Sequence, residues 1–252
     1  MSQLLAPSMG RFALFPIEHQ ALWDMYKKSQ QSMWNAEEID LEGDVADWKR
    51  LSESERSFIT TVLAFFATAD GIVSENAITR LYNEVQLPEA RAFYAVQIYM
   101  EQVHAETYSL LIDRLVDASE KPRLFGAVQH VDCIRAKGEW AIKWLQSDRP
   151  FGERLFAFAI VEGLFFSASF CAIYWLKKKG VMNGVTFSNE LIARDEGMHF
   201  SFAALLFSML DDSERPASDI LHEILREAVV CETQFVQEAL RVDLIGMNSA
   251  LM

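Results

Sequence analysis

Apolar residues recur through most of the chain at spacings of three and four, which is the period of an amphipathic α-helix. One long pattern begins at a capping box formed by Ser52 and Glu55 and runs to about Val85. A second begins at Pro88, which suits the first turn of a helix, and continues to about Val116. These segments predict two long helices.

Four more helical patterns follow, over residues 131–145, 155–176, 188–210 and 218–240. The second of them ends at three lysines and Gly180, a basic last turn with a glycine stop. A loop containing Asn183, Gly184 and Thr186 is expected before the third. No repeat or linker divides the chain, so we expect residues 1–252 to form one all-α bundle with unusually long helices.

The segment 155–176 is long and apolar enough to span a bilayer. Its single charge, Glu162, lies well inside the apolar run, where lipid would make a lone carboxylate costly. Because the chain has one such run, a core helix that is hydrophobic on all sides is the better interpretation. We therefore expect no membrane association.

The amino-acid composition excludes further classes of fold and function. Hydrophobic residues make up 51% of the 252 residues, which suffices for a large core, while 11 Gly and 6 Pro are few for a many-stranded β fold. The net charge of −13 argues against nucleic-acid binding. Three cysteines without a CxxC motif indicate reduced thiols, and the amino terminus lacks a secretory pattern, so a cytoplasmic protein is expected.

Two of the predicted helices carry the same pair of ionisable residues. Glu101 and His104 are three residues apart, as are Glu196 and His199. Tyr108 follows Glu101 by seven residues and shares its helical face. Two Glu-x-x-His pairs on separate helices are the ligand pattern of a di-iron or di-manganese carboxylate bundle.

Such a site needs one more carboxylate from each of two other helices. Glu162 and Asp70 both stand alone in very apolar segments. Either alone has an ordinary explanation: Glu162 could pair with a basic side chain, and Asp70 with the following Gly71 could mark a helix break. Together, the four carboxylates carry −4 and two divalent cations +4, so metal binding would leave a neutral cluster in the core.

At this point the sequence closely resembles the small, radical-generating subunit of class I ribonucleotide reductase in its eukaryotic-type form. The resemblance extends nearly end to end, through RFALFPI, MWNAEEIDL, FFATADGIVSEN, MEQVHAETYSLLID, FAIVEGLFFSASF, TFSNELIARDEGMH and LIGMNSALM. It implies a ferritin-like fold that activates O₂ and supplies a tyrosyl radical to a large subunit, which makes deoxyribonucleotides for DNA replication. It also implies a homodimer.

The resemblance assigns roles to individual residues. It implies two iron ions, or manganese, with three residues for each metal: Asp70, Glu101 and His104 for one, and Glu162, Glu196 and His199 for the other. It makes Tyr108 the residue that is oxidised to the radical.

An apolar pocket is implied around that radical, formed by Phe166, Phe170 and Ile192, although ordinary core packing would equally explain these residues. Trp34 corresponds to the family's electron-relay tryptophan, and Asp195 to the carboxylate that joins this indole to a histidine ligand. Without the resemblance, Trp34 would be taken for a core residue.

Members of the family continue beyond the position of Met252 with a further helix and a tail that docks on the large subunit. We therefore expect this protein to build the radical and to couple poorly to nucleotide reduction. Three other functions use a similar bundle: iron storage, an oxidase or hydroxylase with an open substrate channel, and a partner without turnover that only dimerises.

Overall fold

The computed structural model describes residues 2–6, 11, 13–72 and 79–239. Within the helices, the side chains of Asp70, Ile72, Thr79 and Val128 lie outside that description. The described residues contain no β-strand, which confirms the predicted all-helical class.

Short helices and turns connect a set of long ones. The α-helices are α1 (Gln20–Gln31), α2 (Glu42–Arg50), α3 (Glu53–Ile72), α4 (Thr79–Glu84), α5 (Pro88–Leu115), α6 (Lys121–Phe125), α7 (Ala127–His130), α8 (Asp132–Leu145), α9 (Phe151–Ile160), α10 (Ser167–Lys179), α11 (Asn183–Ser208) and α12 (Ser218–Ala239). A 3₁₀ turn, η1, covers Ala36–Glu38, and a π-helical turn, η3, covers Val161–Phe165.

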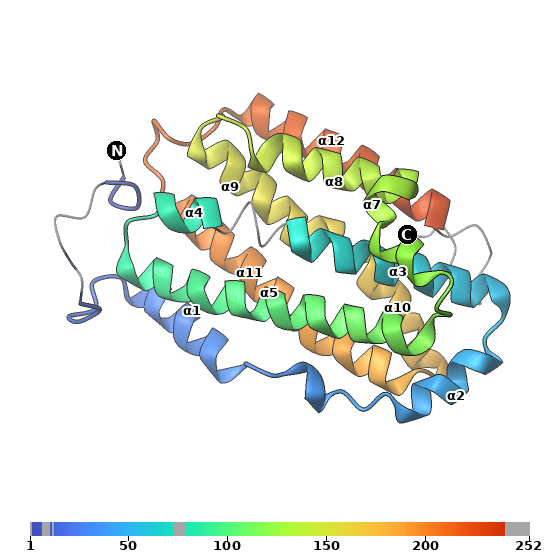
Figure 1. The fold of residues 1–252 in the computed structure, drawn as a ribbon. Helices are drawn as coiled ribbons and strands as arrows, with labels where there is room; N and C mark the ends of the chain where they lie inside the picture. Colours follow the sequence, from blue (N-terminus) through green and yellow to red (C-terminus); the bar gives the residue numbers. More distant parts are fainter. Residues whose placement is uncertain (1, 7–10, 12, 73–78, 240–252) are drawn as a thin grey trace.

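The long helices pack side by side along the length of the molecule (Figure 1). Helix α5 contacts α1, α3 and α11, and α11 also contacts α9 and α10. On the other side of α9, helices α8 and α12 pack against each other. The apolar faces of these helices enclose one continuous core, within which α5, η3 and α11 place their ionisable residues.

Local signals set several helix ends as predicted. The Ser52 hydroxyl accepts the backbone N–H of Glu55 at 3.2 Å, and the Glu55 carboxylate accepts the backbone N–H of Ser52 at 2.8 Å. Pro88 opens α5. Gly180 ends α10 with φ 69°, a left-handed conformation that glycine adopts at little cost.

The predicted loop over residues 183–187 is wrong, because α11 already begins at Asn183. The first N–H groups of a helix need acceptors. Here Asp44 of α2 accepts the N–H groups of Gly184 and Val185 at 2.9 and 2.7 Å. This cap comes from a distant part of the sequence, so the local pattern does not reveal it. The pattern also did not predict α1 and α2.

The long apolar segment is interrupted rather than continuous. Residues 151–179 form the one stretch in the described part of the protein that is long and apolar enough, by composition, to cross a membrane. In that stretch's most apolar window, 56% of residues are buried in the bundle, as a core helix requires. The turn η3 separates α9 from α10, and the periodicity did not predict this interruption.

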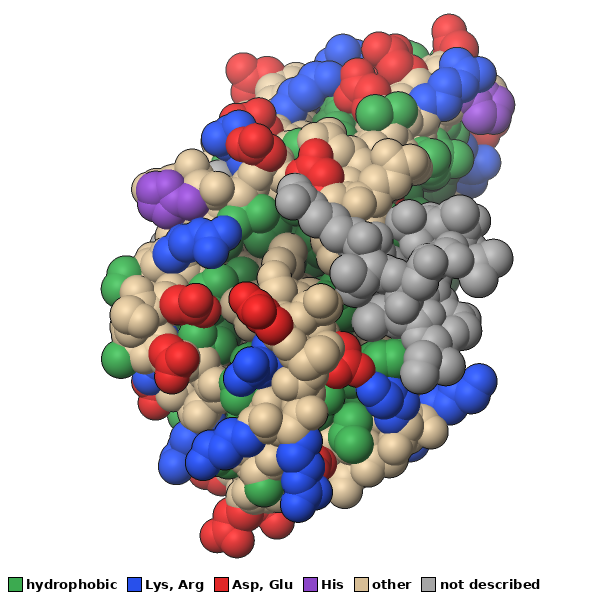
Figure 2. All heavy atoms as spheres, turned by 90° about the vertical axis from the view of Figure 1, so that its right-hand side faces the viewer, with side chains coloured by type: hydrophobic (Ala, Val, Ile, Leu, Met, Phe, Trp, Pro, Cys, Tyr) green, Lys and Arg blue, Asp and Glu red, His purple; other side chains and the backbone are tan. Residues whose placement is uncertain are grey.

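Figure 2 shows the end of the bundle at the right of Figure 1, where acidic and basic side chains are intermixed with apolar ones. On the described residues of this face, the basic side chains do not merge into one extended patch.

Candidate metal centre

Helix α5 delivers the first Glu-x-x-His pair to the core. Glu101 and His104 lie on the same face because they are three residues apart in a regular α-helix. Glu101 is 1% exposed and His104 is fully buried. The Nδ1 atom of His104 lies 3.5 Å from Glu101 Oε2.

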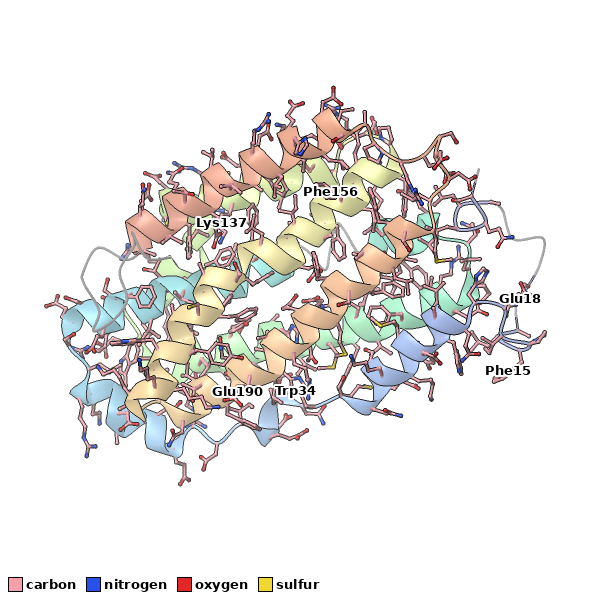
Figure 3. The ribbon with its side chains drawn as sticks, turned by 180° about the vertical axis from the view of Figure 1, so that it is seen from behind. Phe15, Glu18, Trp34, Lys137, Phe156 and Glu190 are labelled. Carbon is pink, nitrogen blue, oxygen red and sulfur yellow. The ribbon has the colours of Figure 1, made fainter. Side chains whose placement is uncertain are left out.

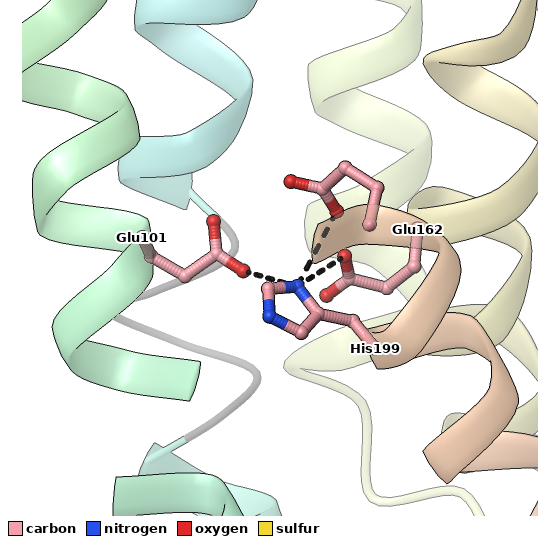
Figure 4. A group of neighbouring side chains, drawn as sticks. Glu101, Glu162 and His199 are labelled. Atoms are coloured by element: carbon pink, nitrogen blue, oxygen red, sulfur yellow. Dashed lines mark ion pairs between the residues drawn. The ribbon is translucent and has the colours of Figure 1, made fainter. Parts of the chain in front are cut away.

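Helix α11 and the turn η3 bring the remaining ligand candidates to the same place. The Nδ1 atom of His199 lies 3.1 Å from Glu101 Oε1, 3.6 Å from Glu162 Oε2 and 3.5 Å from Glu196 Oε2 (Figure 4). His104 Nδ1 lies 3.2 Å from Glu196 Oε1. One ligand atom from each of four buried residues falls within 4.8 Å of the others: Glu101, Glu162, Glu196 and His199.

Five of the six predicted ligands therefore meet in one buried cluster. The sixth, Asp70, belongs to α3, and its side chain lies outside the described residues. Its place in the ligand set stays a prediction.

The polar atoms of the cluster fit a pair of metal ions. Buried ligand atoms on all five residues lack a hydrogen-bond partner of good geometry: Glu101 Oε1, His104 Nδ1, Glu162 Oε2, both carboxylate oxygens of Glu196 and both ring nitrogens of His199. Buried polar atoms left in this condition are costly, and metal coordination would satisfy them. Carboxylate oxygens with imidazole nitrogens suit iron or manganese better than a structural zinc.

Proton affinities in the cluster reflect its excess of buried carboxylates. Burial raises the pKa of Glu162 well above its usual value, and the nearby charges of Glu196 and Glu101 raise it further. Burial acts to lower the pKa of His104 and His199, but the carboxylates that surround both imidazoles outweigh it and raise the pKa of each. These three groups therefore bind protons more strongly in the cluster than they would in water.

Tyr108 lies two turns beyond Glu101 on α5 and is 2% exposed. The ring of Phe66 stacks on it at a centroid distance of 4.7 Å. Phe166 and Phe170, both predicted for the pocket around the radical, pack against Phe66 with ring centroids 5.7 and 5.3 Å away. Ile192 is fully buried on α11, one turn before Glu196.

Phe66 was missed by the sequence analysis, although a signal existed. It precedes Asp70 by four residues and therefore shares its helical face.

Trp34 and Asp195, two of the residues singled out in the sequence, lie in direct contact. The indole Nε1 of Trp34 donates to Asp195 Oδ2 at 2.8 Å, and His104 Nε2 lies 3.2 Å from the same oxygen. The Trp34 and His104 rings stack at 5.9 Å. Figure 3 shows Trp34 beside α11, in the segment that leads from α1 to η1. An unbroken series of contacts thus joins the indole to the cluster.

Gln97 is a further contact of the cluster that the sequence analysis missed. It is fully buried on α5, and its Nε2 donates to Glu162 Oε1 at 3.1 Å. Its position four residues before Glu101 places it on the same helical face, which is the signal that could have found it.

An apolar groove of about 780 Å³ reaches the cluster from the surface. Glu162 and Glu196 form part of its lining, together with aromatic residues that include Phe156, Tyr174 and Phe200. The carboxylates of Glu162 and Glu196, two of the candidate ligands, therefore form part of the wall of an apolar groove.

An all-helical bundle that directs Glu-x-x-His pairs and a further carboxylate into its core defines the class of dimetal-carboxylate proteins. Residues 11–252 match the family described as "Ribonucleotide reductase, small chain". The protein is 54% identical to a ribonucleoside-diphosphate reductase small chain of Arabidopsis thaliana, over 99% of its own length and 73% of that relative. The small subunit of Dictyostelium discoideum is 53% identical, and the match covers 99% of the present sequence and 74% of that subunit.

Solved structures of similar proteins have the same fold. The Rnr4 homodimer of Saccharomyces cerevisiae superposes with a TM-score of 0.90 at 32% identity, covering 99% of the present protein and 79% of that one. The dimanganese(II)-NrdF of Streptococcus sanguinis shares the fold, with a TM-score of 0.85 at 21% identity over 92% of the present protein and 83% of that one. The protein belongs to the ribonucleotide reductase small-chain family, and its function is that of a ribonucleoside-diphosphate reductase small subunit.

Proposed function

We propose that this small subunit binds two metal ions, most simply iron, and uses dioxygen to store an oxidising equivalent on Tyr108. The observation that carries the proposal is the buried cluster of three glutamates and two histidines, two turns along α5 from a buried tyrosine. We propose Asp70, Glu101 and His104 as ligands of one metal, and Glu162, Glu196 and His199 as ligands of the other.

When bound, the two metals would supply the oxidant that takes an electron from Tyr108. The protein's own contribution is to orient the ligands and to exclude water. Gln97 holds one oxygen of Glu162, and Asp195 holds the Nε2 side of His104, which leaves the Nδ1 atom facing the cluster. The groove that ends at Glu162 and Glu196 supports an apolar route for dioxygen.

An apolar pocket around Tyr108 would preserve a radical. Phe66 covers one face of the phenol ring, and Phe166 and Phe170 pack against Phe66. We propose that these side chains, with Ile192, keep water and reductants away. Such a pocket has no use in iron storage, so it favours the radical function over that alternative.

We propose that Trp34 and Asp195 carry the oxidising equivalent between the metal centre and the large subunit. Their hydrogen bond and the contact from Asp195 to His104 support this route. The proposed partners are therefore the large subunit of ribonucleotide reductase and a second copy of this protein. Light scattering that shows only monomer over a wide concentration range would contradict the homodimer.

Two broader proposals concern the protein as a whole. The packing of α5 on α1, α3 and α11 supports a single ferritin-like domain over residues 1–252. The three cysteines, Cys133, Cys171 and Cys231, are free thiols, which supports a reducing compartment such as the cytoplasm.

The test is to load metal-free protein with Fe(II) anaerobically, admit O₂, and record electron paramagnetic resonance together with the metal content. Two irons per protomer and a tyrosyl signal are expected. Two bound irons without any tyrosyl signal would support the metal centre and overturn the role of Tyr108.

A further inference from the structure

A second buried ionic group lies apart from the metal cluster. Lys137 of α8 and Glu232 of α12 are 1% and 8% exposed, and Lys137 Nζ lies 2.6 Å from Glu232 Oε2. The ammonium also contacts two neighbouring aromatic rings, 3.8 Å from the centroid of Phe65 and 4.0 Å from that of Phe235. Three helices thus enclose one buried cation.

The pair contacts the turn that carries Glu162. Lys137 Nζ donates at 2.6 Å to the backbone carbonyl of Phe165, the last residue of the π-helical turn η3. Lys137 therefore holds the end of the π-turn at the point where it returns to α-helix, and Glu232 in turn holds the Lys137 ammonium.

A π-turn is rare because it accommodates an extra residue within a helix, and it often occurs at functional sites. Relaxation of η3 to a regular α-helix would shift the register by one residue, a rotation of about 100° around the helix axis. Such a rotation would turn Glu162 away from Gln97 and His199, which it contacts at 3.1 and 3.6 Å. The direction of Glu162 depends on the π-turn being kept.

Stability alone does not explain a buried pair of this kind. Burial lowers the pKa of Lys137 to about 8 and raises the pKa of Glu232, so both charges are held at a cost. Replacement of a buried ion pair by well-packed apolar residues is often neutral or stabilising.

We propose that Lys137 and Glu232 are positioning residues that hold the π-turn so that Glu162 faces the metal centre. The inference rests on the proposed role of Glu162 as a metal ligand. It assigns to α8 and α12 a part in metal binding, although neither helix supplies a ligand.

The test compares two double variants on the same two helices. Lys137→Met with Glu232→Leu removes the buried pair. Lys143→Met with Glu227→Gln is the control, because it removes a pair nearer the surface, in which an exposed Lys143 lies 2.8 Å from a half-buried Glu227 between α8 and α12. The glutamine keeps an acceptor for the Trp144 indole. The metal-free proteins are titrated anaerobically with Mn(II), and amide hydrogen exchange is measured over residues 161–168.

The buried-pair variant should bind one metal, the one that Glu162 is proposed to hold, about tenfold more weakly. This loss is within the range seen when groups that support a ligand are removed. Its amides over 161–168 should exchange faster, while its unfolding midpoint stays unchanged or rises. The control should match the wild type in all three measurements. A second version, Lys137→Leu with Glu232→Met, is read in the same way if the first does not fold.

Unchanged Mn(II) affinity and unchanged exchange in a folded buried-pair variant would overturn the proposal. Failure of the proposed metal centre would look different, because the wild-type protein itself would then not bind two metals. Faster exchange confined to residues 161–168, with weaker binding, would support the positioning role.

Discussion

The metal cluster and the Lys137–Glu232 pair are both buried groups of charged side chains, but their charges are balanced differently. Glu101, Glu162 and Glu196 converge with two imidazoles, and among the described residues no Lys or Arg pairs with these three carboxylates. Lys137 and Glu232 carry opposite charges 2.6 Å apart. The Lys137–Glu232 pair balances its charges within the protein, whereas the metal cluster requires cations from outside it.

This difference shows how a binding site can be told from a structural ion pair. Buried charges need compensation in a medium of low dielectric constant. Where the protein supplies both signs, the group can serve the fold. Where it supplies only carboxylates and histidines, either protons or metal ions must complete it.

The strongest way to break the metal cluster is Glu162→Ala. This change removes a ligand, unbalances the charge and should abolish tight binding of one of the two metals. Metal analysis after anaerobic Fe(II) loading and desalting measures it. Two tightly bound irons in this variant would exclude Glu162 as a ligand. Glu153→Ala, which removes a buried glutamate elsewhere in the protein, serves as the control.

Tyr108→Phe should separate the radical from the cluster. The ring volume is kept and the phenol is not proposed as a ligand, so two irons should still bind and O₂ should still be consumed. The tyrosyl signal should disappear from the electron paramagnetic resonance spectrum. Tyr94→Phe, at another buried tyrosine on α5, should keep it. A signal of full intensity in the Tyr108 variant would place the radical on another residue.

A change of glutamate to glutamine should have different effects on the free energy of unfolding in the Lys137–Glu232 pair and in the metal cluster. Glu232→Gln leaves the buried Lys137 ammonium without its counter-charge and should lower the free energy of unfolding by about 3–5 kcal/mol. Glu162→Gln in metal-free protein removes a carboxylate whose pKa is raised by burial, so it should leave stability unchanged or increase it. Denaturant unfolding of both metal-free variants measures the contrast, and equal losses would contradict it.

Metal binding should weaken as the pH falls. The pKa values of His104, His199 and Glu162 are raised, so these groups keep protons to higher pH than they would in water, and metal ions must compete with those protons. Each displaced proton changes the affinity by about tenfold per pH unit in the range below the raised pKa values. Calorimetry of Mn(II) binding in buffers of different ionisation enthalpy counts the protons released. Binding without proton release would show that the cluster holds no protons when empty.

The local pattern was enough for the fold class and for part of the site. Helical spacing alone places Glu101 with His104, and Glu196 with His199, on shared faces. The capping box at Ser52 and the glycine stop at Gly180 also formed as predicted. These features depend on neighbours within a few residues along the sequence, so the amino-acid sequence determines them directly.

The contacts between helices were decided only by the tertiary structure. Asp44 caps α11 from a different helix, and Gln97 reaches Glu162 across the core. The pairing of Lys137 with Glu232 and the π-turn at Glu162 left no periodic signal. Each of these contacts depends on how two or more helices pack, and residues far apart in sequence meet only once the whole bundle has formed.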